Sequence, residues 1–323
     1  MVDVFLIGGK RSRSVRTHQG RYEEKGIVIR SWKHSQPATG TGHDARGVDA
    51  SYSTDANTMN YQTIQYAVTD SVAHLRFNRP EKMNSFNAQM HDEISAALDT
   101  VERDKSIRVL VLTGVGRAFC AGQDLADSEV QFTPGQLPPD LGDVVERRYK
   151  PLVNRLANLR VPTIAAVNGT AAGAGVSIAL ACDLVIACQS AGFMLPFAKI
   201  GLIPDTGCSW HLPRHIGQAR ALGLAMTGNK ISAQKAADWG MIWEVLDDQA
   251  FVAGVDVLAQ QLALMPTHAL VRTRQAMRLA HTHTLEQHLS YEGMLMCELG
   301  RSADYVEGVS AFLDKRKPNF SGS

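Results

Sequence analysis

Phe119-Cys120-Ala121-Gly122-Gln123-Asp124-Leu125 follows a continuous apolar run at residues 109–112. Asn168-Gly169-Thr170-Ala171-Ala172-Gly173-Ala174-Gly175 follows a second such run at residues 163–167. Runs of this kind are typical of strands that are buried on both faces. Small residues with free backbone N–H groups therefore come at the ends of two buried strands. The second segment also opens a helical pattern at residues 176–182, so its N–H groups would lack intrahelical partners and favour negative charge.

Two interpretations of these small residues remain open at this point. Two converging N–H groups could hold an oxyanion that develops during a reaction. Alternatively, glycine and alanine only allow backbone segments to pack closely. Neither segment alone decides between a binding site and close packing.

The pattern around both segments alternates between strands and helices, which predicts an α/β fold of the βαβ type. A polar, proline-rich stretch at residues 128–140 indicates a loop or lid. The expected strands lie at residues 66–68, 72–77 and 184–186, and the expected helices at 87–101, 144–159 and, almost continuously, 219–313.

The chain divides into three parts by composition. Residues 1–58 are polar and basic, and we expect an unstructured extension or a start codon placed too early, with Met59 as the true start. Residues 59–255 are expected to form the core, and residues 256–323 a helical C-terminal region.

The overall composition excludes several classes of protein. Among 323 residues, 33 Lys and Arg balance 32 Asp and Glu, so no general attraction to nucleic acid or acidic membranes is expected. The most apolar stretch, residues 164–188, is interrupted by Asn168 and Asp183 and does not predict a transmembrane helix. The five cysteines contain no C-x-x-C pair, which favours a reducing compartment such as the cytoplasm and gives no zinc site.

Familiar cofactor and metal motifs are incomplete. Gly173-Ala174-Gly175 lacks the third glycine of a dinucleotide-binding fingerprint, because Ile178 stands there. His211 and His215 are four residues apart, but the glutamate of a zinc-protease motif is absent between them. We therefore expect neither a metal nor a bound cofactor.

From about Met59 onward the sequence resembles the crotonase, or enoyl-CoA hydratase/isomerase, superfamily. The resemblance rests on four segments, which are Asn78-Arg79-Pro80-Glu81-Lys82-Met83-Asn84-Ser85-Phe86, the turn at 121–124, the segment at 169–175 and Gly201-Leu202-Ile203-Pro204-Asp205. It implies a spiral of ββα units that form two nearly perpendicular sheets, with a helical C-terminal region for assembly into trimers or dimers of trimers. It also implies an acyl-CoA thioester as the substrate.

The resemblance assigns roles to three catalytic residues. The backbone N–H groups of Gln123 and Ala174 fall on the oxyanion-hole positions. Asp205 falls on a position that serves as the base in several isomerases, although an aspartate after proline is also a common turn residue. The two glutamate positions of the hydratases hold Ser177 and Phe197, so hydration through two carboxylates is not expected.

The family also implies positions that bind the CoA thioester or line its cavity. Asp124 is expected to cap a following helix. Asp140 and Asp143 could line the cavity, but we expect them to be solvated loop acids. Cys208 replaces a glycine that most members have beside the base. The expected binding positions are Lys82, Met83, Ala121, Gly122, Asp124, Leu125, Gly173, Gly175 and Phe197, together with Phe312 and Lys315, which in relatives often come from a neighbouring subunit.

A narrower resemblance is to the isomerases that convert ring-1,2-epoxyphenylacetyl-CoA to 2-oxepin-2(3H)-ylideneacetyl-CoA in aerobic phenylacetate degradation. It includes Trp239-Gly240-Met241-Ile242-Trp243 and Gly300-Arg301-Ser302-Ala303-Asp304-Tyr305. A Δ3,Δ2-enoyl-CoA isomerase or hydratase-like enzyme of fatty-acid or aromatic breakdown is the alternative. A non-catalytic scaffold that binds acyl-CoA is a third interpretation.

Overall fold

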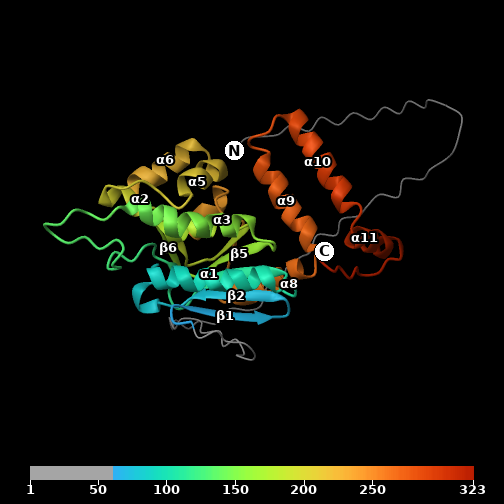
Figure 1. Cartoon of the computed structure of the whole chain (residues 1–323), viewed down its shortest axis with the longest axis horizontal. Coiled ribbons are helices and arrows are strands. Elements are labelled where there is room, and N and C mark those ends of the chain that lie inside the picture. Colours follow the sequence, from blue (N-terminus) through green and yellow to red (C-terminus); the bar gives the residue numbers. More distant parts are fainter. Residues whose placement is uncertain (1–60) are drawn as a thin grey trace, which may run out of the picture. The chain divides into compact units, whose positions relative to one another are not determined.

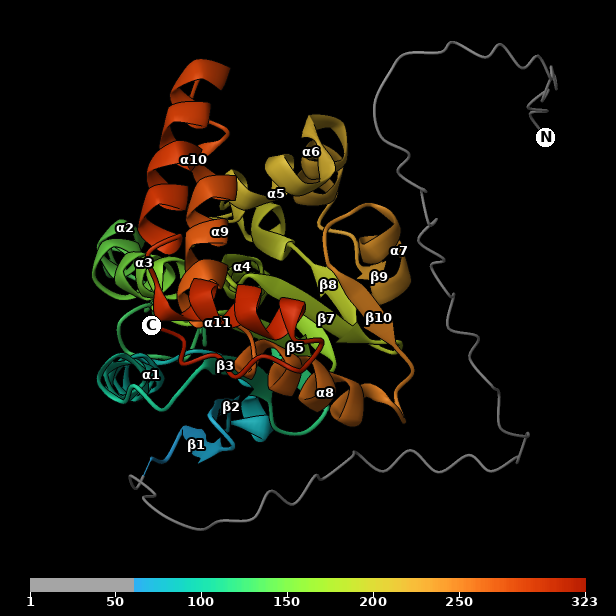
Figure 2. The same cartoon turned by 90° about the vertical axis from the view of Figure 1, so that its right-hand side faces the viewer.

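A computed structural model describes residues 61–323, which build two β-sheets flanked by helices (Figures 1 and 2). The expectation for residues 1–58 lies outside the described residues. The larger sheet has the strand order β1 (Ile64–Thr69), β2 (Val72–Phe77), β3 (Val109–Gly114), β5 (Thr163–Val167), β7 (Leu184–Cys188) and β10 (Glu244–Leu246). The smaller sheet has the order β4 (Ala118–Cys120), β6 (Thr170–Ala172), β8 (Gly192–Met194) and β9 (Ile231–Ser232).

The central strands of the larger sheet pair in parallel, which explains their unbroken apolar sequences. In β5 every residue is buried, and in β3 all but Thr113 are buried. Leu110 pairs with Thr163, and Ile164 pairs with Leu184 in the next strand. Because helices cover both faces of such a sheet, side chains that point to either face are apolar. Polar and apolar residues therefore do not alternate along these strands.

Successive strand pairs pass from the larger sheet to the smaller one. β3 is followed by β4, β5 by β6, and β7 by β8, and each first strand belongs to the larger sheet and each second strand to the smaller. The strand pairs thus repeat along the chain as the spiral requires, and the predicted fold class is confirmed. The repeat places the chain segments after β4 and β6 side by side.

Helices on both sides bury the larger sheet. On one side α1 (Ala88–Arg103) begins where the Asn87 side chain accepts the N–H of Met90, and it buries an apolar stripe against β1 and β2. On the other side α8 (Phe251–Ala263) packs on β2, β3 and β7. The helix α4 (Ala174–Ala181) is buried along its whole length, in contact with strands of both sheets.

Three sequence predictions differ from the structure. The helix expected at 144–159 is divided into α2 (Leu141–Val144), a π-helical turn η2 (Val145–Tyr149) and α3 (Lys150–Asn158). The stretch expected to be helical from residue 219 contains the strands β9 and β10. The strands β4, β6 and β8 were not predicted, because three residues are too few to display a period of two.

The remaining helices are one turn before α1 and several elements that follow β8. They are the 3₁₀ turns η1 (Pro80–Lys82) and η3 (Pro196–Ile200) and the helices α5 (Cys208–Ile216), α6 (Gln218–Thr227), α7 (Ala233–Asp238), α9 (Thr267–Leu279), α10 (Leu285–Leu299) and α11 (Ala303–Leu313). The expected division after residue 255 falls inside α8 and stays a prediction. No helix within residues 61–323 has the length and apolar character needed to cross a membrane.

Candidate active site

The two glycine-containing segments that follow β4 and β6 lie against each other. Gly122 and Gly173 have φ angles of 95° and 55°, in the region that favours glycine. A Cβ atom added to Gly122 would lie 3.1 Å from the carbonyl oxygen of Ala172 and 3.3 Å from the backbone nitrogen of Ala174. Glycine at position 122 therefore allows Gln123 and Ala174 to come together.

The backbone N–H groups of Gln123 and Ala174 have no protein acceptor among residues 61–323. Gln123 is held from both sides, because the Phe86 N–H donates to the Gly122 carbonyl at 2.7 Å and the Phe86 carbonyl accepts the Asp124 N–H at 2.8 Å. Ala174 is the first residue of α4, where the helix dipole favours negative charge. Two fixed donors of this kind can stabilise an oxygen atom that gains negative charge.

The two residues that carry these donors line a cavity of about 1120 Å³, large enough for an acyl group and part of its carrier. The walls are mostly apolar and come from the segments after β4 and β6, from α2 and η2, and from the η3 turn. Of the predicted positions, the cavity lining contains Asp205, Gln123, Ala174, Ala121, Gly122, Leu125, Gly173 and Phe197.

Asp205 reaches this cavity from a turn that is fixed to both neighbouring helices. Its carbonyl accepts the N–H of Cys208 at 2.8 Å and the hydroxyl of Ser177, in α4, at 3.1 Å. Burial raises the pKa of the Asp205 carboxyl, while the Thr206 hydroxyl, which donates to Oδ1 at 2.9 Å, lowers this pKa. Asp205 has no cationic partner within the described residues, so the carboxylate is suited to accept a proton.

The cysteine beside Asp205 leaves this turn intact. Gly207 takes the left-handed conformation, with φ of 82°, and Cys208 begins α5 as a fully buried residue. Burial raises the pKa of the Cys208 thiol to about 12, so the thiol stays protonated and unreactive.

Other acidic residues at the cavity are exposed and differently engaged. Asp143 pairs with Arg147 at 2.7 Å, and Glu146 pairs with Lys150 at 2.5 Å. The Asp140 carboxylate accepts the N–H of Asp143 at the start of α2. In the part of the chain that the structure describes, no group of three or more His, Cys, Asp or Glu side chains is placed to hold a metal ion.

Tyr149 is a cavity residue that the sequence analysis missed. Its side chain is 2% exposed, and its hydroxyl donates to Oε1 of Gln123 at 2.6 Å. Burial raises the pKa of the Tyr149 phenol well above its ordinary value, with the negative charge of Asp205 adding to the effect. An aromatic residue in a helical pattern looks like an ordinary core residue, so only the π-helical turn distinguishes Tyr149.

Two predicted residues have roles other than those expected. Asp124 caps no helix, because turns follow it; its carboxylate accepts the N–H of Ala126 and pairs with Arg79 at 2.9 Å. Gly175 does not line the cavity: a Cβ atom there would lie 2.3 Å from the carbonyl oxygen of Cys120. Gly175 therefore serves the close packing of α4 on β4.

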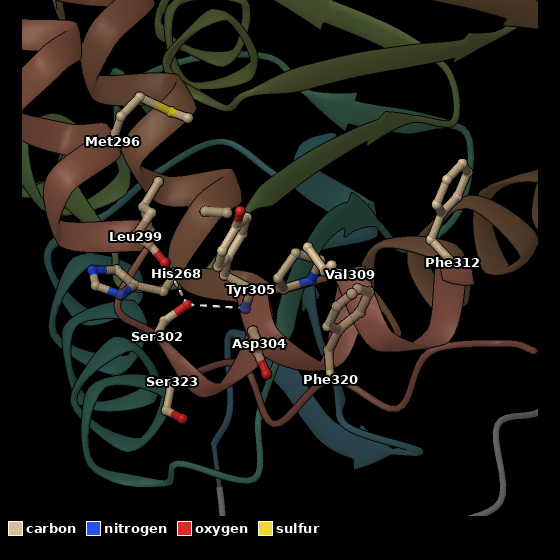
Figure 3. A pocket seen from close by; sticks show the side chains of 14 residues that line it. His268, Met296, Leu299, Ser302, Asp304, Tyr305, Val309, Phe312, Phe320 and Ser323 are labelled. Atoms are coloured by element: carbon tan, nitrogen blue, oxygen red, sulfur yellow. Dashed lines mark hydrogen bonds between the residues drawn. The ribbon is translucent and has the colours of Figure 1, made fainter. Parts of the chain in front are cut away.

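Four predicted CoA contacts lie outside this cavity in the single chain. Lys82 and Met83 end the η1 turn, and the Met83 carbonyl accepts the N–H of Ala121. Phe312 lines a second cavity among α9, α10 and α11, with its ring 82% exposed in the free chain (Figure 3). Lys315 is exposed in the turn after α11. Their contacts with CoA stay predictions.

The fold and this site define an enzyme of the crotonase class, and comparison with known sequences agrees. The family model described as enoyl-CoA hydratase/isomerase matches residues 67–323. The chain belongs to this family, and the predicted family membership is confirmed.

Individual relatives within the family have different reactions. The chain is 53% identical over 255 residues to the 1,2-epoxyphenylacetyl-CoA isomerase of Escherichia coli K12, which covers 79% of this chain and 97% of the relative. It is 35% identical over 247 residues to a 4-chlorobenzoyl coenzyme A dehalogenase of an Arthrobacter species. The match covers 76% of this chain and 89% of that relative. The expectation of an isomerase is supported by the name of the first relative.

A solved structure has the same fold. The enoyl-CoA hydratase of Bacillus anthracis superposes with a TM-score of 0.75 at 30% identity, over 81% of this chain and all of that chain. Because relatives with one fold carry out hydration, dehalogenation and isomerisation, the reaction must be argued from the side chains at the site.

Proposed function

We propose that this chain isomerises an acyl-CoA thioester, and that the substrate is ring-1,2-epoxyphenylacetyl-CoA. The observation that carries the proposal is the position of Asp205, a partly buried carboxylate without a cationic partner among residues 61–323. It lines the same cavity as Gln123 and Ala174, whose backbone N–H groups have no acceptor among these residues. The identity of 53% to an isomerase of 1,2-epoxyphenylacetyl-CoA favours this acyl group.

The proposed reaction moves one proton and leaves the composition of the substrate unchanged. The Asp205 carboxylate removes a proton from the carbon next to the thioester carbonyl, and the Gln123 and Ala174 N–H groups stabilise the enolate oxygen. The ring carbon–carbon bond shared with the epoxide opens to the seven-membered oxepin. The protonated Asp205 then returns the proton to a ring carbon, which gives 2-oxepin-2(3H)-ylideneacetyl-CoA. A positioned base of this kind contributes about 10²–10⁴ in rate.

Addition of water fits the side chains less well than isomerisation. The positions that resemble the two hydratase glutamates hold Ser177, whose hydroxyl donates to the Asp205 carbonyl, and the buried Phe197. Neither side chain can activate water. The proposed proton transfer needs no metal and no redox cofactor, because one carboxylate and two N–H donors suffice.

We also propose assembly into a homotrimer or a dimer of trimers, in the cytoplasm. Exposed large apolar side chains on the C-terminal helices, among them Leu285, Leu289 and Met296 of α10, support a protein partner for this region. Phe312 and Lys315 would then reach the CoA of a neighbouring subunit. The buried free thiols of Cys120, Cys182, Cys188 and Cys208 suit a reducing compartment.

A product assay tests the proposed function. The full chain is mixed with freshly generated ring-1,2-epoxyphenylacetyl-CoA and, separately, with 3-hexenoyl-CoA, and products are followed by chromatography and mass spectrometry. We expect the oxepin thioester from the wild type and a loss of about 10²–10⁴ in kcat for Asp205→Asn. Asp143→Asn, at a paired acid of the same cavity, should keep its activity.

Each other outcome of this assay has a definite meaning. Turnover of 3-hexenoyl-CoA alone would keep the mechanism and assign the chain to general enoyl-CoA isomerisation. Turnover of neither thioester would reject the proposed function. Full activity of Asp205→Asn would place the base elsewhere or support a scaffold role.

A further inference from the structure

A partly buried hydrogen bond joins two side chains of this cavity. The Tyr149 hydroxyl donates to the Gln123 side-chain oxygen at 2.6 Å, and both residues line the cavity. The bond involves the side chain of Gln123, whereas the oxyanion role uses only its backbone N–H. A glutamine side chain fixed inside a mostly apolar cavity therefore needs a separate explanation.

The ring of Tyr149 is held rigidly by its surroundings. It packs edge-on against His91 with centroids 4.6 Å apart, and against Phe86 at 6.0 Å. Burial lowers the pKa of His91 to about 4, so this ring is uncharged near neutral pH. Because Phe86 also brackets the Gln123 backbone through two hydrogen bonds, the backbone and the side chain of Gln123 are fixed independently.

The hydrogen bond from Tyr149 determines which side-chain atom of Gln123 remains available to bind a ligand. Burial keeps the Tyr149 phenol protonated, so the hydroxyl is a donor and occupies the glutamine oxygen. Among residues 61–323, the glutamine nitrogen Nε2 has one long contact, of 3.4 Å, with the Asp124 carbonyl. An N–H donor is thus left on the residue whose backbone N–H is aimed at the thioester oxygen.

We infer that the Tyr149–Gln123 pair selects acyl groups that carry an oxygen atom close to the thioester. Tyr149 acts as a positioning residue, and the Gln123 Nε2 group donates to the oxygen of the acyl group. An acyl group without this oxygen forms no hydrogen bond with Nε2 and is bound less well. The inference rests on the proposed function, in which the ring epoxide supplies the oxygen.

The test measures binding and does not depend on turnover. Isothermal titration calorimetry compares 2-hydroxyphenylacetyl-CoA with phenylacetyl-CoA, and 4-hydroxyphenylacetyl-CoA serves as a positional control. We expect the full-length wild type to bind the 2-hydroxy thioester about three- to tenfold more tightly than phenylacetyl-CoA. The 4-hydroxy group should give no such preference. Tyr149→Phe and Gln123→Leu should each reduce the ratio of the two dissociation constants toward one.

The ratio of the two dissociation constants distinguishes recognition of the acyl oxygen from a purely structural role of Tyr149 and Gln123. Loss of packing would weaken both thioesters equally and leave the ratio unchanged, which would overturn the inference. A wild type without preference would overturn it as well, even if the isomerase assay succeeds. Tyr66→Phe is the matched control, because the buried Tyr66 hydroxyl in β1 has no hydrogen-bond partner among residues 61–323. If Tyr149→Phe does not fold, Gln123→Leu decides alone.

Discussion

The two ends of helix α4 differ in how their polar groups are paired. At the N-terminal end, the Ala174 N–H has no acceptor within residues 61–323, and the nearby Asp205 carboxylate has no cation. At the C-terminal end, Arg278 donates to the Ala181 carbonyl at 3.1 Å. Asp183, two residues further on, lies 2.9 Å from Arg274 and 3.5 Å from Arg278.

The two aspartates lie near opposite ends of one buried helix and have opposite surroundings. Asp183 also accepts the N–H of Thr163 at 2.9 Å, so it joins β5, α4 and α9. Asp205 accepts a hydrogen bond from the Thr206 hydroxyl, and its pKa is raised by burial. The Asp183 charge is paired with two arginines inside the protein, although its Oδ1 and the Arg274 Nε make no hydrogen bond among residues 61–323. The Asp205 charge has no such cation, which leaves it available to a substrate.

Arg274→Met should have the largest effect and change stability without changing the chemistry. The variant leaves the Asp183 charge with only the more distant Arg278, and it removes hydrogen bonds to the carbonyls of Leu159 and Val161. Loss of one partner of a buried ion pair costs about 3–5 kcal/mol. Urea unfolding should record this loss in the free energy of unfolding, while kcat of the folded enzyme stays near the wild-type value.

An exposed arginine provides the control for this variant. Arg220→Met removes a surface side chain beside Trp239 and should change stability by less than about 0.5 kcal/mol. Equal destabilisation by both substitutions would contradict the structural role of the Asp183 cluster.

Ala174→Pro tests the opposite end of α4 and should affect the chemistry more than the fold. Proline fits the first residue of a helix and removes an N–H that has no acceptor in the described part of the chain. Loss of one oxyanion donor lowers kcat by about 10²–10³. Initial rates and thermal unfolding should be measured on the same preparation. Ala303→Pro, at the first residue of the exposed helix α11, is the matched control and should keep full activity.

The sequence predicted the N-terminal end of α4 better than the C-terminal end. The continuous apolar strands and the glycines at 122 and 173 predict where the two backbone N–H donors lie. Such donors require only the end of a strand and small residues, and both features are visible in the sequence. Asp205 was recognisable only through resemblance, because an aspartate after proline is equally suited to a turn. The Asp183–Arg274 pair spans 91 residues of chain, and no local pattern predicts it.

Tyr149 and the short strands are further features that the sequence alone does not predict. A π-helical turn changes which residues share a helix face, and hydrophobic periodicity does not reveal it. The strands β4, β6 and β8 are held by pairing with each other, so their stability is tertiary.

The smallest expected effect concerns the pH dependence of Asp205. The Thr206 hydroxyl donates to the carboxylate and lowers its pKa, so Thr206→Val should raise this pKa further. Since Asp205 must be ionised to accept a proton, the acid limb of kcat/KM should move to higher pH. On that limb the variant should be about three- to tenfold slower than the wild type, and near the wild-type rate at alkaline pH.

Stability should follow the same shift with a definite sign. Because the folded-state pKa of Asp205 is raised above its unfolded value, its contribution to stability is present at acid pH. That contribution is lost as pH rises through the folded-state pKa. Thr206→Val should therefore lose more stability than the wild type between acid and neutral pH. Thr273→Val, on the exposed face of α9, should leave both profiles unchanged. An acid limb that stays in place in Thr206→Val would mean that another group controls the proton transfer, and the contrast between the two aspartates would then no longer explain the activity.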